Sequence, residues 1–190
     1  MATIILINSN KMFWGNRMED ILETIVSRRS VKKYKSDKVE GELVERVIKA
    51  GTYAPSGKNR QAGTIIAITN TEVRNDISKI IADFRGVDID PFYNASVVLA
   101  VVVDKSINTA VYDGSCIIEN MLLEAHSLGL GACWVHHSKE VFETDYGKRL
   151  LQNLGIDGDM EGVGFCVLGY PDIEVTGVLP RKDNYVYYVN

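Results

Sequence analysis

The stretch TAVYDGSCIIENMLLEAHSLGLGACW, residues 109–134, decides the fold, because its central part predicts a long helix with apolar residues on two faces. A broad apolar stripe contains Val111, Ile117, Ile118, Met121, Leu122, Ala125 and Leu128. A narrow second stripe contains Tyr112, Cys116 and Leu123. An ordinary surface helix needs one apolar face, so this helix has a neighbour on each side. The pattern leaves open whether it is a central core helix or whether its second stripe meets a partner subunit.

Strands and further helices are predicted on both sides of this helix. Gly129 and Gly131 can end it, because glycine adopts the left-handed conformation at little cost. Apolar runs typical of buried strands occupy residues 64–69, 97–103, 132–136 and 161–170. Amphipathic helices are predicted at 18–27, 43–50, 70–84 and 141–154. The helices precede and separate the strands without a regular alternation, which favours an α+β fold over a doubly wound sheet.

Composition restricts the classes of protein to which the chain can belong. With 190 residues it forms one domain, or one domain with extensions, and can bury a sizeable core. Its net charge of −4 provides no basic field for nucleic acid, and no apolar run approaches the roughly 20 residues of a membrane span. The three cysteines are far apart and lack metal-ligand spacing, so we expect free thiols in a reducing, cytoplasmic compartment.

Residues 1–17 are predicted to be an extension to a single domain at 18–190. The apolar run at 4–7 is too short for a signal-peptide core, no basic residue precedes it, and no small-residue cleavage site follows. Asn8, Asn10 and Gly15 then indicate a loop. The extension is expected to be an extra edge strand, a disordered arm or the product of an upstream start codon.

Residues 27–34, SRRSVKKY, concentrate positive charge at the end of the first helix. The eight residues include four cations, Arg28, Arg29, Lys32 and Lys33, together with the hydroxyl of Ser30. Arginine pairs with phosphate oxygens in two-point geometry and lysine adds a mobile point charge, so the cluster suits an anionic ligand. The alternative is a solvated basic corner that stabilises the helix C-terminus.

Residues 54–61, APSGKNRQ, are predicted to form a loop that can recognise a heterocycle. Asn59 and Gln61 each carry a hydrogen-bond donor and an acceptor. Gly57 lets the backbone approach a ligand closely. The alternative is an ordinary solvent-exposed turn.

No metal site and no catalytic side chain are expected. His136 and His137 raise the hypothesis of a metal site with His126 and Cys133, but adjacent residues of a strand point to opposite faces. Cys133 lacks an activating base in the sequence pattern and is interpreted as an inert thiol.

Trp134 and the pair formed by Arg181 and Lys182 each allow two interpretations. Trp134 is either a core residue or, beside the glycines, the wall of a pocket for a planar ligand. Arg181 and Lys182 are either a second basic pair for the same anion or part of a solvated tail.

Three of these motifs occur in one order: RRSVKKY, then APSGKNRQ, then GLGACW after the long helix, and a basic pair follows the strand end GYP. In this arrangement the chain resembles the FMN-dependent nitroreductase family from residue 18 to about residue 182. The resemblance implies an α+β homodimer with a central, mostly antiparallel sheet flanked by helices and with FMN at the subunit interface. The helix with two apolar stripes would then supply much of the dimer contact.

The resemblance also implies roles for individual residues toward FMN. Phosphate and ribityl oxygens would be held by Arg28, Arg29 and Ser30, and the same phosphate by Arg181 and Lys182. The pyrimidine edge of the ring would meet Lys32. The partner subunit would contact the ring edge through Pro55, Ser56, Gly57, Asn59 and Gln61. The flavin would be bordered by Trp134, Val135 and His136, with a backbone N–H facing its N5.

The implied activity is that of an NAD(P)H oxidoreductase. In a ping-pong scheme, FMN takes a hydride from NADH or NADPH and then passes electrons to a nitroaromatic, a quinone or a similar small acceptor. Enone reductases and dehalogenases share the fold, so the acceptor is left open. A flavin-binding or flavin-storing protein without turnover, and a dimeric interaction protein without a cofactor, are the alternatives from other classes.

The phosphate assignment predicts the behaviour of a double variant. Arg28→Ala with Arg181→Ala should weaken FMN binding about 100-fold or more, because two charge-assisted hydrogen bonds to phosphate are lost. The dimer should stay intact. The measurement is the Kd for FMN with the molecular mass in solution, and Arg85→Ala with Lys148→Ala serves as a control outside the motifs. An unchanged Kd would mean that both basic clusters are solvated corners.

Overall fold

Within residues 21–189, the part of the chain that the computed structural model describes, four strands form one antiparallel sheet. The strands are β1 (Gly63–Ile68), β2 (Val97–Asp104), β3 (Gly131–Val135) and β4 (Met160–Gly169), in the order β1-β2-β4-β3. The helices are α1 (Ile21–Ser27), α2 (Gly41–Thr52), α3 (Thr71–Arg85), α4 (Ala110–Ser127), α5 (Ser138–Glu143) and α6 (Asp145–Asn153). The predicted α+β fold is confirmed, and the extension expected at 1–17 lies outside the described residues.

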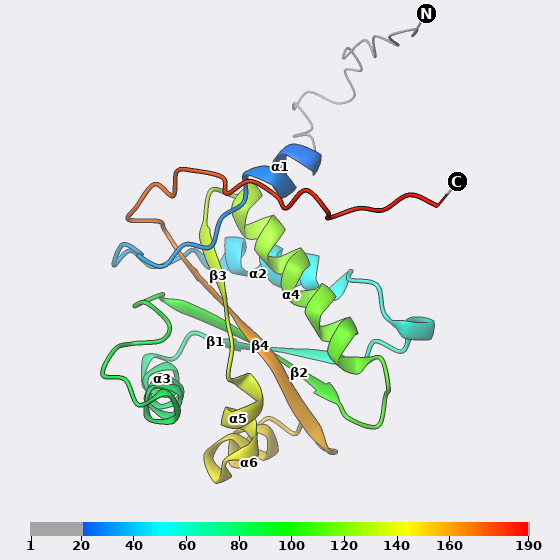
Figure 1. The fold of residues 1–190 in the computed structure, drawn as a ribbon. Helices are drawn as coiled ribbons and strands as arrows, with labels where there is room; N and C mark the ends of the chain where they lie inside the picture. Colours follow the sequence, from blue (N-terminus) through cyan, green and yellow to red (C-terminus); the bar gives the residue numbers. More distant parts are fainter. Residues whose placement is uncertain (1–20, 190) are drawn as a thin grey trace, which may run out of the picture.

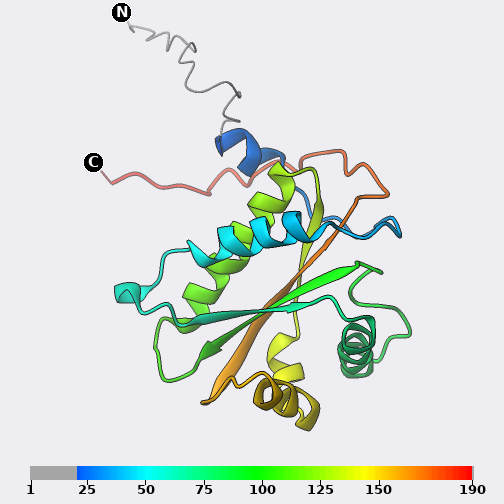
Figure 2. The same cartoon turned by 180° about the vertical axis from the view of Figure 1, so that it is seen from behind.

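Helices cover both faces of the sheet. α2 and α4 lie on one face, and α3, α5 and α6 lie on the other (Figures 1 and 2). Alternate side chains of β2 enter the two cores: Leu99 and Val101 belong to the first, and Val98 and Val102 to the second. A central strand that is covered on both faces requires the continuous apolar run by which it was predicted.

The broad apolar stripe of α4 packs against the sheet. Its buried members are Ile117, Ile118, Met121, Leu122 and Ala125. The prediction is wrong for Val111, whose side chain is exposed. Gly114, one turn later, already packs on Val103, the penultimate residue of β2. The first turn of α4 therefore extends beyond the end of the sheet.

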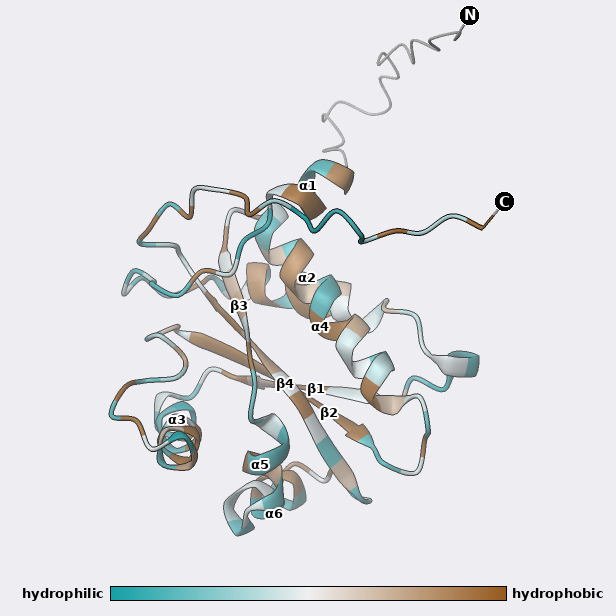
Figure 3. Ribbon diagram, in the orientation of Figure 1, coloured by the Kyte–Doolittle hydropathy of each residue, from teal (hydrophilic) through white to brown (hydrophobic). Residues whose placement is uncertain are grey.

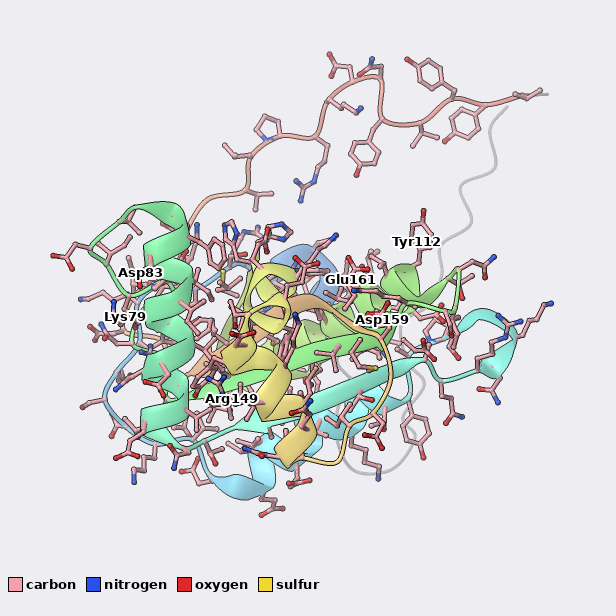
Figure 4. The ribbon with its side chains drawn as sticks, turned by 90° about the horizontal axis from the view of Figure 1, so that it is seen from below. Lys79, Asp83, Tyr112, Arg149, Asp159 and Glu161 are labelled. Carbon is pink, nitrogen blue, oxygen red and sulfur yellow. The ribbon has the colours of Figure 1, made fainter. Side chains whose placement is uncertain are left out.

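The second apolar stripe of α4 is only partly covered by the described part of the chain, and Leu123 shares a groove with Ile21 and Ile25 of α1. Tyr112 is 74% exposed, and Cys116 and Leu123 are half-buried. Figure 4 shows Tyr112 projecting away from the body of the domain. Of the two interpretations of this helix, an open second face favours contact with a partner subunit.

The single helix predicted at 141–154 is wrong, because two helices, α5 and α6, meet at Thr144. The backbone of Thr144 is extended (φ −70°, ψ 160°), and its hydroxyl accepts a hydrogen bond from the N–H of Gly147 at 3.1 Å. Threonine as an N-cap ends one helix and begins the next. The apolar spacing continues through the break, which is why the pattern does not show it.

The C-terminal segment leaves the domain as an exposed chain (Figure 1). Tyr187 and Tyr188 are 78% and 84% exposed, and residues 178–189 pair with no strand of the described chain. Pairing of this segment as a strand on another subunit stays a prediction.

The carboxylate of Asp90 fixes the segment between α3 and β2. It accepts hydrogen bonds from the backbone N–H groups of Phe92 (3.0 Å) and Asn94 (2.6 Å), from the Ser78 hydroxyl (2.6 Å) and from the buried Arg74 guanidinium. Burial acts to raise the pKa of Asp90, but these hydrogen bonds outweigh it and hold the pKa below its ordinary value.

Asp90→Asn should lower the free energy of unfolding by about 1–3 kcal/mol at neutral pH, because buried Arg74 loses its charged partner. The folded-state pKa of Asp90 is depressed, so its carboxylate stabilises the fold above the unfolded-state pKa of about 3.9 and loses this effect as the pH falls through the folded value. Urea unfolding of both proteins should therefore show a stability difference that is constant from about pH 7 to about pH 5 and shrinks below about pH 4.

Asp83→Asn is the matched control for this prediction. Within residues 21–189, Asp83 forms an ion pair with exposed Lys79 along the outer side of α3 (Figure 4), so its loss should change stability by less than about 0.5 kcal/mol. A stability difference for Asp90→Asn that does not depend on pH would contradict the role of its charge.

Candidate functional site

The basic segment after α1 lies along the open edge of β3. Ser30 forms a parallel bridge with Ala132, and the N–H of Val31 donates to the carbonyl of Ala132 at 3.0 Å. Gly131 permits this approach, because a Cβ there would lie 2.9 Å from Cγ1 of Val31. The fold thus brings the RRSVKKY motif beside the GLGACW motif, about a hundred residues away in sequence.

Arg28 presents a buried donor without an acceptor. Its Nε has no hydrogen-bond partner and forms a longer ion pair with Oε1 of Glu119 on α4, at 3.7 Å. A buried guanidinium N–H without an acceptor is costly. Together with Arg29 and Lys32, Arg28 provides the positive charge that an anionic group such as the phosphate of FMN would need.

Unlike Arg28, Arg29 donates its hydrogen bonds to backbone carbonyls. Its Nη1 donates to the carbonyls of Val26 (2.8 Å) and Arg28 (2.6 Å), and its Nε donates to the carbonyl of Gly177 (3.3 Å). The guanidinium therefore ties the C-terminal segment to the end of α1. Arg181 lies four residues after Gly177, within a span of about 14 Å for an extended chain.

β3 offers an open backbone edge beyond the bridge at Ala132. The carbonyl of Ala132 faces Val31, and backbone groups of a strand alternate in direction, so the N–H and C=O of Trp134 face the same open edge. The half-buried Trp134 ring packs over Gly164, where a Cβ would lie 2.4 Å from the indole Nε1.

The side chains next to Trp134 point elsewhere. Val135 is buried in the opposite core, whereas His136 is exposed just past the strand. Lys32 is exposed with its Nζ 5.8 Å from the ring centroid of Tyr93. Burial raises the pKa of the Cys133 thiol, which agrees with its interpretation as inert.

Residues 54–61 lie at the other end of α4. The N–H of Gly57 donates to Oδ1 of Asp113 in the first turn of α4, at 3.0 Å. The short 3-10 turn η1 (Gly57–Asn59) lies within this loop, and Pro55, Asn59 and Gln61 are exposed while Ser56 is half-buried.

Within one chain the basic segment and the 54–61 loop contact different parts of α4, and the Arg28–Glu119 pair lies between the two outer contacts. Ser27 contacts α4 near its C-terminus, through a 2.8 Å hydrogen bond with His126, whereas the loop contacts Asp113. Thirteen residues of helix separate these contacts by roughly 20 Å along the axis. Figures 1 and 2 show α1 and η1 at opposite ends of α4.

The second basic pair is exposed on the C-terminal segment. Arg181 and Lys182 make no ion pair in the described chain, and the Nζ of Lys182 is 5.4 Å from the ring centroid of Tyr185. The segment reaches the site region through the contact of Gly177 with Arg29.

The sequence analysis did not assign Glu119 or Asp113 to the site. Both are carboxylates on polar strips of α4, and only the tertiary structure places one beside Arg28 and the other beneath Gly57. The sequence does show acidic residues on a helix with two apolar stripes, and this pattern could have marked them as candidates.

Known proteins provide an independent comparison. A model of the nitroreductase family matches residues 25–85 and 86–170. An NADH dehydrogenase/NAD(P)H nitroreductase of Archaeoglobus fulgidus is 31% identical over 164 residues, which cover 83% of this chain and 88% of that protein. The NADPH-flavin oxidoreductase of Vibrio harveyi is 28% identical, with 82% of this chain and 67% of that protein covered.

Solved structures show the same similarity. A Bacteroides fragilis nitroreductase with bound FMN superposes with a TM-score of 0.81 at 26% identity, covering 91% of this chain and all of that chain. Among residues 21–189, no helix has the length and apolar character that crossing a membrane requires.

Proposed function

Because the chain belongs to the nitroreductase family, we propose that it is an FMN-dependent NAD(P)H oxidoreductase that acts on nitroaromatics, quinones or similar small acceptors. The observation that carries the proposal is the open edge of β3, lined by a cationic segment whose Arg28 Nε is buried without an acceptor. FMN binding by a protein of similar fold supports the choice of cofactor.

Residues 18–190 would form one FMN-binding domain, with the phosphate at the basic segment. Arg28 and Ser30 would bind phosphate and ribityl oxygens, and Arg181 and Lys182 would close on the phosphate from the C-terminal segment. Arg29 would support the site by holding that segment at Gly177, and its unbonded nitrogen could also face the phosphate.

The flavin ring would lie along the open backbone edge of β3. The Trp134 N–H faces this edge and could donate to the ring, while His136 borders it at the strand end. The indole of Trp134 is held between the sheet and α4 and would exclude water from one side. The ammonium of Lys32 would favour negative charge at the pyrimidine edge.

A homodimer would complete this site. In addition to the second stripe of α4, the outer face of α1 is apolar and exposed, at Ile21, Leu22, Ile25 and Val26. Figure 3 colours much of the α1 ribbon as hydrophobic. Exposed patches of this kind mark interfaces, and a two-fold contact between α4 helices in antiparallel orientation would bring the 54–61 loop of one subunit to the basic segment of the other.

When bound, FMN supplies the hydride chemistry, accepting a hydride from NADH or NADPH and passing electrons to the acceptor after the nicotinamide has left. The residues of this chain bind and orient the reactants. A ping-pong order requires no protein acid or base for the first half-reaction, so no catalytic side chain is proposed.

The test is whether the purified protein retains FMN and whether NADH or NADPH reduces it. After incubation with FMN and removal of the unbound flavin, the protein should keep a shifted flavin spectrum. Anaerobic addition of one of the two nucleotides should then bleach it, faster than it bleaches free FMN. Retained flavin that neither nucleotide reduces would indicate a flavin-storage protein, and a folded protein without flavin would contradict the proposed function.

A further inference from the structure

Within the 54–61 loop, residues 55–61 have a strained backbone that contacts with other parts of the domain must hold. Lys58, Asn59 and Gln61 all have left-handed backbone angles, with φ of 55°, 53° and 52°. Residues other than glycine adopt this conformation at a cost, and it persists where surrounding contacts impose it. The loop is therefore held in place by specific interactions.

Hydrogen bonds within the loop set its shape but do not attach it to the domain. The N–H of Asn59 donates to the Ser56 carbonyl at 3.0 Å, and the N–H of Gln61 donates to the Ser56 hydroxyl at 3.1 Å. Among the hydrogen bonds of residues 21–189, the bond from Gly57 N–H to Asp113 is the one that joins residues 55–61 to another element.

Asp113 is a buried carboxylate whose two oxygens both accept hydrogen bonds. It is 6% exposed, and its Oδ1 accepts from Gly57 N–H at 3.0 Å while its Oδ2 accepts from the Thr109 hydroxyl at 3.2 Å. No ion pair of the described chain includes it. A carboxylate buried without a cation is costly, so a residue with this arrangement indicates a specific use.

Packing alone does not fix the loop against α4. A cavity of about 270 Å³ lies behind it, lined by residues that include Ala54, Ser56, Gln61, Asp113 and Ile117. At Gly57 the loop touches the N-cap of α4 closely, since a Cβ on Gly57 would lie 2.4 Å from the Thr109 hydroxyl. The loop can therefore move into space unless Asp113 holds it.

We propose that Asp113 is the positioning residue that fixes the 55–61 loop for contact with the flavin ring. This inference rests on the proposed function, in which the amides of Asn59 and Gln61 meet the ring of the FMN bound by the partner subunit. A loop that is ordered before binding avoids the entropic cost of ordering it on binding. Asp113 contacts no flavin itself and acts through Gly57.

A first experiment tests the loop without FMN. Lys58 and Arg60 are exposed, so trypsin can cleave after them, and mass spectrometry resolves these cuts from those elsewhere. In the flavin-free protein, Asp113→Ala should speed both cleavages about tenfold, because losing a hydrogen bond to a carboxylate shifts local opening by that order. Asp113→Asn keeps an acceptor for Gly57 N–H and should restore slow cleavage.

A second experiment measures the Kd for FMN and for riboflavin, which lacks the phosphate. Asp113→Ala should weaken both ligands by about the same factor, tenfold or more, since a ring contact is lost. Arg28→Ala should weaken FMN far more than riboflavin. Asp145→Ala, which removes an exposed first-turn carboxylate from α6, is the matched control and should change neither value.

Gly57→Ala provides a second route if Asp113→Ala does not fold. The added methyl group displaces the loop from Thr109 and Asp113 while Asp113 itself is kept, and it should give the same rise in cleavage and in Kd.

Unchanged cleavage in the Asp113 and Gly57 variants would overturn the positioning role. Faster cleavage with an unchanged Kd would overturn the link to flavin while leaving the proposed function intact. Wild-type protein that binds no flavin would contradict the proposed function itself.

Discussion

The packing of α4 on β2 and β4 is the interaction on which the rest of the structure depends. Gly114 and Gly164 permit it, because a Cβ on Gly114 would lie 2.7 Å from a methyl carbon of Val163 and a Cβ on Gly164 would meet the Trp134 indole. The close approach buries one face of α4 and seats Trp134 at the edge of the sheet. It also leaves the opposite face, with Tyr112, open to solvent.

The length of α4 sets the distance between the two segments that we propose to bind FMN. One end of this helix lies against the basic segment at Ser27 and the other holds the 54–61 loop through Asp113, roughly 20 Å apart. In the proposed site, these two regions are half-sites, and the half-site at one end of α4 would be completed by the loop of a second subunit. In the homodimer that we propose, an antiparallel two-fold contact between α4 helices would join each half-site to its complement and would also cover the apolar stripe of α4.

Much of the fold could be predicted from local pattern, and the failures have physical causes. The continuous apolar run of β2 and the helical spacing of α4 reflect burial directly, and both were predicted. The break at Thr144 was missed because a capping hydroxyl overrides a spacing that continues through it, and Val111 was misplaced because periodicity does not show where the sheet ends. The motifs RRSVKKY and APSGKNRQ indicated that the site contains cations and side-chain amides. The contact of Arg28 with Glu119 and the hydrogen bond from Gly57 to Asp113 form only when distant segments pack, so no local pattern shows them.

The central claim is that each FMN site combines two subunits, and heterodimers test it most directly. One subunit carries Arg28→Ala; the other carries Asn59→Gly with Gln61→Gly, which removes both amides and keeps the left-handed backbone. The account predicts that each homodimer binds FMN weakly, whereas the heterodimer, purified with two different tags, binds one FMN with wild-type affinity at its one undamaged site. If loop and basic segment serve the same subunit, the heterodimer has no undamaged site, and weak binding at both sites would contradict the account.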